Sequence, residues 1–118
     1  IAIIRSILSD SREMFSVNVL NHGAVPGLPD DAALEIPGVA TGRGLRPVSV
    51  PDLSPAITAI LARRLTSVSL GVEAAMTGDR ALVVEAMLAD GAVQDPRAAA
   101  RLATALIEAQ AHHLPAFA

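Results

Sequence analysis

Apolar residues follow two different rhythms along this chain, and each rhythm predicts one kind of element. In the first half they form short, β-rich runs, so Glu13–Leu20 and Ala33–Val39 are predicted strands and Arg46–Val50 is a third. No crossover helix separates these runs, which favours antiparallel pairing. Residues 1–8 are typical of the last turns of a helix, closed by a turn at Ser9–Ser11.

After Leu53 the period changes to that of a helix. Ser54 and Pro55 are the residue types preferred at a helix start, and Gly78 is the type preferred just past a helix end. Between them, apolar residues recur at steps of three and four: Ile57, Ile60, Leu61, Leu65, Val68, Val72 and Met76. This spacing predicts one long helix with a single apolar face.

Two more helices follow, each preceded by an aspartate that can cap it. Asp79 precedes a predicted helix over residues 80–89, and Asp95-Pro96 begins one over 96–113. The last helix is expected to bury the stripe Ala99, Leu102, Leu106 and Ala109. The predicted fold is therefore α+β, a small antiparallel sheet followed by three helices, in a single domain over residues 1–118.

Composition adds a prediction about partners. Hydrophobic residues make up 52% of the chain and charged residues 18%, which is more apolar than usual for a soluble domain. Two interpretations stay open: a tightly packed alanine-rich domain, or a domain that buries apolar surface against another domain or a second copy. The first residue is Ile1, with no capping residue ahead of the first helix, so we expect a fragment of a longer protein.

Charge and hydropathy exclude some classes of partner. The net charge of −3 gives no indication of a nucleic-acid surface. No apolar run reaches the roughly 18–20 residues needed to span a bilayer, and no signal peptide is apparent. We expect a cytoplasmic protein that binds neither nucleic acid nor membrane.

Few residues offer chemistry on their own. Gly42-Arg43-Gly44 lacks the third glycine of a dinucleotide motif and is interpreted as a surface turn. His112 and His113 are adjacent, so on a helix they point about 100° apart and do not form one metal site. Asp30 and Asp31 diverge in an extended segment and do not form a carboxylate pair. Glu35 is expected on the strand face opposite Leu34 and Ile36.

The segment from Asn21 to Asp31 is the exception. It holds two glycines and two prolines, which predicts a loop with fixed turns, and His22 lies within it among polar neighbours. A histidine in such a loop either lines a pocket or stabilises the turn.

This loop and the strand after it resemble glycoside hydrolase family 4, the NAD- and metal-dependent glycosidases. The matching positions are Asn18, Asn21, Gly23, Leu28, Pro29, Asp31, Glu35 and Pro37. Further along, Arg46-Pro47, Val72-Glu73-Ala74, Thr77-Gly78-Asp79 and Leu114–Phe117 match in order. His22 departs from the pattern, since many relatives have Gly or Asn there. The similarity spans essentially the whole chain and corresponds to the C-terminal domain of a lactate/malate-dehydrogenase-like plan.

The resemblance implies a parent enzyme that hydrolyses O-glycosidic bonds by oxidation, elimination, addition and reduction. A Rossmann domain would bind NAD, a Cys and a His would bind manganese, and a Tyr would act as base in several members. This chain has no Cys and no Tyr, so we expect no catalytic, cofactor-binding or metal-binding residue in it and no activity alone.

What the resemblance leaves to this chain is a supporting role. Asn21, His22, Gly23 and Asp31 are the candidates for lining the substrate cleft. The alternative for Asn21 and Asp31 is that they fix the loop through side-chain to backbone hydrogen bonds. The expected partners are the Rossmann domain, a carbohydrate substrate and a second copy of the chain. Two other interpretations are a non-enzymatic helical dimerisation module and the C-terminal domain of a lactate/malate-type dehydrogenase.

Overall fold

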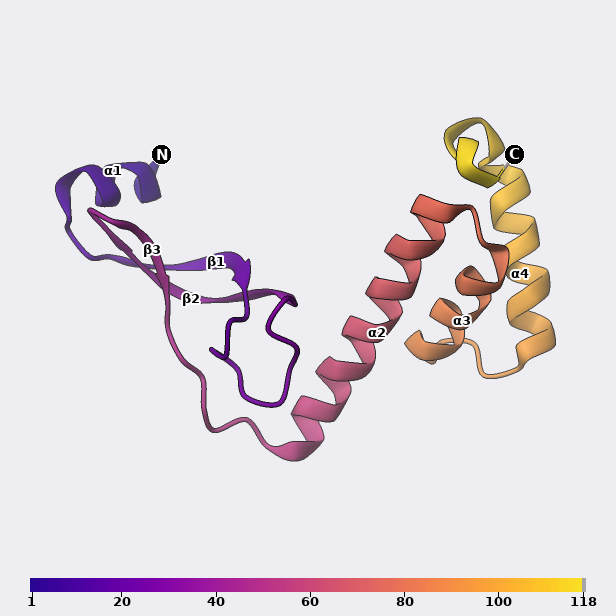
Figure 1. Cartoon of the computed structure of the whole chain (residues 1–118), viewed down its shortest axis with the longest axis horizontal. Helices are drawn as coiled ribbons and strands as arrows, with labels where there is room; N and C mark the ends of the chain where they lie inside the picture. Colours follow the sequence, from indigo (N-terminus) through magenta and orange to yellow (C-terminus); the bar gives the residue numbers. More distant parts are fainter. Residues whose placement is uncertain (118) are drawn as a thin grey trace. The chain divides into compact units, whose positions relative to one another are not determined.

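The computed structural model describes residues 1–117 and confirms the α+β class (Figure 1). Its elements are α1 (Ala2–Ser9), β1 (Met14–Leu20), β2 (Ala33–Thr41), β3 (Gly44–Pro47), α2 (Pro55–Thr77), α3 (Arg80–Asp90), α4 (Pro96–Ala109) and two short 3-10 helices, η1 (Ala111–His113) and η2 (Pro115–Phe117). The chain forms two compact units, and the boundary between them in the sequence lies between Thr58 and Ala59. The assignment of both units to one domain stays a prediction.

The first unit is built on the three-stranded antiparallel sheet, in the order β1-β2-β3. Val17 pairs with Ile36 in the β1–β2 register, and both side chains are buried, so one face of the sheet carries the core. Glu35 lies on the other face, as predicted, and accepts a hydrogen bond from Ser16 Oγ at 2.9 Å. The alternation of apolar and polar residues therefore gives the correct faces for β1 and β2.

The third strand lies earlier in the chain than predicted. It spans Gly44–Pro47 and not residues 46–50, because a two-residue turn lets Gly44 pair directly with Thr41. Past Pro47 the chain leaves the sheet, and the Val50 N–H donates to the Ala24 carbonyl at 2.7 Å. The segment predicted as a strand is thus used partly to hold another loop.

Helix α1 is attached to the sheet by buried polar contacts. Ser6 is fully buried, and its Oγ donates to the Ala40 carbonyl at 3.3 Å and accepts from the Glu13 N–H at 3.2 Å. At the other end of the helix, Asp10 caps α1 in a left-handed conformation and accepts the Gly42 N–H at 2.8 Å. These bonds fix α1 across β2 and the turn that follows it.

The predicted helix starts after Leu53 are all confirmed. Ser54 Oγ accepts the Ile57 N–H at 3.3 Å, and Asp79 and Asp95 cap α3 and α4 by accepting backbone N–H groups two residues on. Gly78 ends α2 with a φ of 74° and donates its N–H to Ala74. Capping chemistry is thus readable from the sequence here.

Helix α4 is shorter than predicted, ending at Ala109 and not at residue 113. The Gln110 backbone leaves the helical region, with φ −111° and ψ 13°, and His113 then donates to the Gln110 carbonyl in a 3-10 turn. Pro115 has no N–H to continue an α-helix and disfavours helical geometry at Leu114.

The buried stripe of α4 also differs from the prediction. The structure buries Ala99, Ala103 and Ile107, whereas Leu102 and Leu106 are 42% and 48% exposed. A row of small side chains lets the backbones of two helices approach closely, so α4 turns its alanine row inward against α3 and leaves its leucines at the surface.

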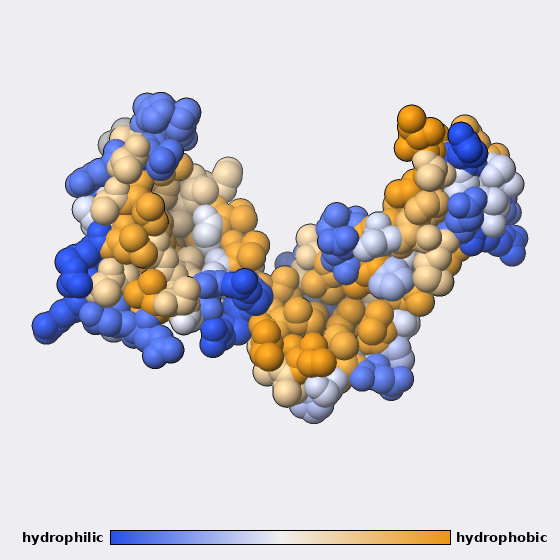
Figure 2. Space-filling model, turned by 180° about the vertical axis from the view of Figure 1, so that it is seen from behind, coloured by the Kyte–Doolittle hydropathy of each residue, from blue (hydrophilic) through white to orange (hydrophobic). Residues whose placement is uncertain are grey.

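Helix α2 leaves most of its predicted apolar face exposed. Ile60, Val68, Val72 and Met76 are 64%, 62%, 58% and 80% exposed, and Ala74 is its buried residue. Figure 2 shows apolar surface gathered where α2 begins. Among the helices of residues 1–117, none combines the length and apolar character that a membrane span requires.

Candidate functional site

The loop between β1 and β2 is a closed structure with its own hydrogen-bonded neck. The Asn21 N–H donates to the Ala32 carbonyl at 2.9 Å, and the His22 N–H donates to the Asp30 carbonyl at 2.9 Å. These two bonds continue the antiparallel pairing past the last residues of the strands, so residues 21–32 project as one unit from the end of the sheet (Figure 1). We call this segment the 21–32 loop.

Asn21 braces the 21–32 loop from inside. Its side chain is fully buried, and its amide nitrogen donates to the carbonyls of Val25, Leu28 and Pro29 at 3.1, 3.0 and 3.2 Å. Its Oδ1 accepts the Val25 N–H at 2.7 Å. Every polar atom of the side chain is therefore used by the loop backbone, which is the second of the two roles that the sequence allowed for Asn21.

The other three candidate residues lie at the surface of the loop. His22 and Gly23 are exposed, and both have left-handed backbones, with φ of 42° and 79°. Asp30 and Asp31 are exposed as well. Asn, Asp and His tolerate the left-handed region better than other side chains, which is consistent with a histidine at position 22. The loop thus presents His22, Gly23 and Asp31 on a base that Asn21 holds.

Apolar residues anchor the base of the 21–32 loop, and of these the sequence pattern singled out only Leu28, as a position that matches the family. Ala24, Val25 and Leu28 are buried, with exposures of 8%, 3% and 7%. The Ala24 carbonyl also accepts from Val50 N–H and from Ser49 Oγ. The signal that could have found them was three apolar residues inside a Gly- and Pro-rich loop.

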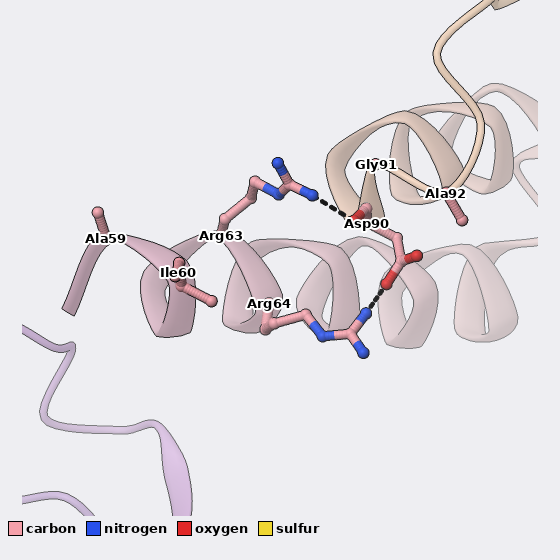
Figure 3. A pocket seen from close by; sticks show the side chains of 7 residues that line it. All are labelled: Ala59, Ile60, Arg63, Arg64, Asp90, Gly91 and Ala92. Atoms are coloured by element: carbon pink, nitrogen blue, oxygen red, sulfur yellow. Dashed lines mark hydrogen bonds and ion pairs between the residues drawn. The ribbon is translucent and has the colours of Figure 1, made fainter. Parts of the chain in front are cut away.

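A cavity of about 610 Å³ lies between α2 and α3 in the second unit, and Figure 3 shows its charged residues. Arg63 donates to the Asp90 carbonyl at 2.5 Å, and Arg64 forms an ion pair with the Asp90 carboxylate. Asp90 is the last residue of α3, so Arg63 places a cation at the negative end of that helix. The hydrogen bond and the ion pair link α2 to α3, and the charge of Arg64 is paired with that of Asp90.

No group of three or more His, Cys, Asp or Glu side chains in residues 1–117 could hold a metal ion. His112 and His113 stack on each other in η1, with ring centroids 3.6 Å apart. Gly42 and Arg43 form the β2–β3 turn, and a dinucleotide phosphate needs a turn that leads from a strand into a helix.

Residues 1–93 match the family model described as the family 4 glycosyl hydrolase C-terminal domain. The chain belongs to this family.

Relatives of known name agree with this assignment. A probable 6-phospho-β-glucosidase from Bacillus subtilis (strain 168) is 31% identical over 115 residues, covering 98% of this chain and 26% of its own length. The solved structure of a 6-phospho-α-glucosidase from gut microorganisms, in complex with NAD and glucose 6-phosphate, is 30% identical. It superposes with a TM-score of 0.86 over 97% of this chain and 26% of that one.

A second solved structure carries a metal as well. The 6-phospho-β-glucosidase from Thermotoga maritima, with manganese, NAD⁺ and glucose 6-phosphate, is 24% identical and has a TM-score of 0.85 over 96% of this chain and 28% of its own. At that identity the likeness shows the shared fold. The chain spans about a quarter of the length of the relatives it matches, and NAD and manganese bind to structures of the family.

Proposed function

We propose that this chain is the substrate-cleft and oligomerisation domain of a cytoplasmic, NAD- and manganese-dependent glycosidase. The parent enzyme hydrolyses O-glycosidic bonds by oxidation, elimination, addition and reduction. This domain walls one side of the sugar site with the 21–32 loop and is inactive alone. The names of the relatives include both α- and β-glucosidases, so the proposal covers O-glycosides as a class.

The observation that carries the cleft role is the construction of the 21–32 loop. Holding a surface turn with a buried asparagine costs free energy, because each of its buried polar groups must find a hydrogen-bond partner. Here four hydrogen bonds meet that requirement. The residues it holds outward are a histidine, a flexible glycine and an aspartate, which suit contacts to sugar hydroxyls. Rigid loops that carry polar groups are common at binding sites.

The exposed row on α2 supports the oligomerisation role. Val68, Val72 and Met76 recur at steps of four residues, so they lie within about 80° of one another around the helix and form one exposed apolar row. An apolar row this exposed is typical of a surface that another protein segment covers. Either a second copy of the chain or the Rossmann domain would bury this row. The oligomeric state of the isolated chain distinguishes the two.

The activity prediction is tested with the chain and with a chimera. We expect residues 1–118 alone to give no turnover of aryl glycosides or their 6-phosphates with NAD and Mn²⁺. Replacing the matching segment of the Bacillus subtilis relative by this chain should retain activity that deletion of the segment abolishes. In that chimera, His22→Ala should raise KM several-fold more than kcat falls, since the side chain contacts substrate and not the reacting bond.

Matched outcomes make this test decisive. Ser16→Ala, on the exposed face of β1 in the same sheet, serves as the control and should leave KM unchanged. Turnover by the isolated chain would overturn the inactivity prediction. An active chimera whose KM is unchanged by His22→Ala, by Gly23→Ala and by Asp31→Ala would overturn the cleft role.

The oligomer prediction concerns the exposed row on α2. Light scattering of the isolated chain at micromolar concentration should show a dimer. The double variant Val68→Glu/Val72→Glu should convert it to a monomer, because charges placed in an apolar interface lose their hydration. Thr66→Glu, exposed on the same helix but off the row, is the matched control and should stay dimeric. A wild-type monomer would assign the row to the Rossmann domain.

A further inference from the structure

A second cavity, about 480 Å³ in volume, lies at the β2–β3 turn and is rich in guanidinium groups. Its lining residues are Asp10, Arg12, Thr41, Gly42, Arg43 and Arg46. They come from four places in the chain: the α1–β1 connection, the last residue of β2, the turn and β3. The lining holds three arginines and one aspartate, which give it a formal charge of +2.

The single carboxylate is already engaged and stays ionised. Asp10 Oδ1 accepts the Gly42 N–H at 2.8 Å, and its other oxygen accepts from Arg12 at 3.4 Å. The Gly42 hydrogen bond is the main cause that holds the pKa of Asp10 below its ordinary value; desolvation opposes it, and Arg12 adds a smaller lowering effect. Asp10 therefore neutralises one positive charge at neutral pH and has little left to offer the other two arginines.

Arg43 and Arg46 have no acidic partner in the part of the chain that the structure describes. The ion pairs found among residues 1–117 are Arg12 with Asp10 and Arg64 with Asp90. The next carboxylate along the chain, Glu13, accepts from Ser11 Oγ at 2.9 Å and does not line the cavity. Arg43 and Arg46 thus line the same cavity without an acidic partner among the described residues.

The backbone around the cavity is fixed before any ligand arrives. Thr41 Oγ1 donates to the Gly44 carbonyl at 2.8 Å and accepts the Arg43 N–H at 3.2 Å, which closes the turn. Asp10 and Arg12 both have left-handed backbones, with φ of 48° and 58°. Side chains other than glycine hold such conformations at a cost, and these conformations concentrate at ligand clamps. A rigid frame reduces the entropy lost on binding.

We propose that this cavity binds a phosphate dianion, carried as a phosphate monoester or free. The planar N–H fork of arginine matches the oxygens of phosphate, and two charges balance the +2 of the lining. Arg43 and Arg46 bind the oxygens, Arg12 shares its charge with Asp10, and the Gly42–Asp10 bond sets the position of the turn. Neutral sugars offer nothing to this charge.

This site is separate from the 21–32 loop and goes beyond the proposed function. The loop precedes the first residue of β2, and the arginine turn follows its last residue. At about 3.3 Å per residue, the nine-residue strand places the two sites roughly 25 Å apart, at opposite ends of the sheet. A failure at one site leaves the other untouched.

The test is a titration of the 118-residue chain with inorganic phosphate and with glycerol 3-phosphate, at constant ionic strength, followed by amide NMR. We expect saturable shifts at the N–H groups of residues 42–44 and none with glycerol. Arg43→Gln/Arg46→Gln should weaken binding at least tenfold, and Arg43→Lys, which keeps the charge but loses the fork, should weaken it a few-fold. Binding should fall about fourfold from pH 7.5 to 5.5 as a monoester with a second pKa near 6 takes up a proton.

The two ligands distinguish a phosphate monoester from free phosphate, and the arginine variants show whether the cavity binds either of them. Tenfold tighter binding of glycerol 3-phosphate than of inorganic phosphate would assign the site to monoesters, and equal binding would assign it to the phosphate group alone. Arg101→Gln, an exposed arginine on α4, is the control and should change nothing. Shifts that do not saturate, or that survive in Arg43→Gln/Arg46→Gln with its NMR spectrum otherwise native, would overturn the proposal.

Discussion

Replacing Asn21 by alanine should lower the free energy of unfolding of the first unit by about 3 kcal/mol, a large share of the total stability of a small domain. The side chain is fully buried and makes four hydrogen bonds to the backbone of its own loop. Alanine leaves the Val25 N–H and the Leu28 carbonyl without a protein partner, whereas the Val25 and Pro29 carbonyls keep the bonds from the Leu28 and Ala32 N–H groups. Each buried polar group without a partner costs about 1–3 kcal/mol, and water entry offsets part of the sum.

Urea unfolding measures the change, and two further variants define its cause. Asn18→Ala removes an exposed asparagine from β1 in the same unit and should change stability by less than about 0.5 kcal/mol. Asn21→Asp keeps the shape and the acceptor for the Val25 N–H but turns a carboxylate toward three carbonyl oxygens. It should therefore be worse than alanine at neutral pH. A loss below 1 kcal/mol for Asn21→Ala would show that the brace is dispensable.

The same substitution links the fold to the proposed cleft. In the chimeric enzyme, Asn21→Ala should raise KM as His22→Ala does, since the loop that carries His22 loses its inner support. The melting temperature distinguishes the two variants, because Asn21→Ala lowers it and His22→Ala does not. This separation tests whether Asn21 is a positioning residue.

Local chemistry made much of the fold predictable. Ser54, Asp79 and Asp95 act through backbone groups two or three residues away, so their capping roles appear in the sequence itself. Strands β1 and β2 followed from short, β-rich apolar runs, and their antiparallel pairing followed from the absence of a crossover helix between them. The resemblance to the family rested on the same local features, spaced glycines, prolines and acidic residues.

The errors arose where the outcome depends on a partner distant in sequence. Helix α4 has two apolar rows, and periodicity cannot say which of them faces α3. The row that contains Ala103 is buried because small side chains permit close approach of the two helices, and Leu102 lies at the surface. Similarly, residues 48–50 have strand-like composition, yet the backbone of Val50 is used by the 21–32 loop.

The candidate site was predictable as a segment and less so as individual roles. Glycines and prolines marked the 21–32 loop, but burial of Asn21 depends on where Val25 and Leu28 turn back toward it. The arginine cavity was not predicted, because Arg12 and Arg43 are brought together by long-range hydrogen bonds to β2 and its turn, among them the bond from Gly42 to Asp10. Long-range hydrogen bonds of this kind leave no periodic signal.

Replacing Gly78 by alanine should destabilise the second unit by about 2–4 kcal/mol, for two separable reasons. Gly78 has a φ of 74°, a conformation that alanine adopts at a net cost of about 1 kcal/mol. The added methyl group would also meet the backbone carbonyl of Ala116, far inside contact distance. The C-terminal turn would have to move away, and Arg80 would lose its bond to the Phe117 carbonyl, which is 3.0 Å long.

A double-mutant cycle divides the two contributions. Truncation after Leu114 removes the carbonyl that the methyl group meets, so Gly78→Ala in the truncated chain should cost only the backbone part, about 1 kcal/mol. Gly23→Ala gives an independent value for that part, because Gly23 has a φ of 79° and open space where the methyl group would lie. Equal losses for Gly78→Ala in the full and truncated chains would show that the C-terminal turn does not pack on this helix junction. A smaller loss in the truncated chain assigns the difference to that contact, and with it a structural role to the Leu114–Phe117 segment that ends the family resemblance.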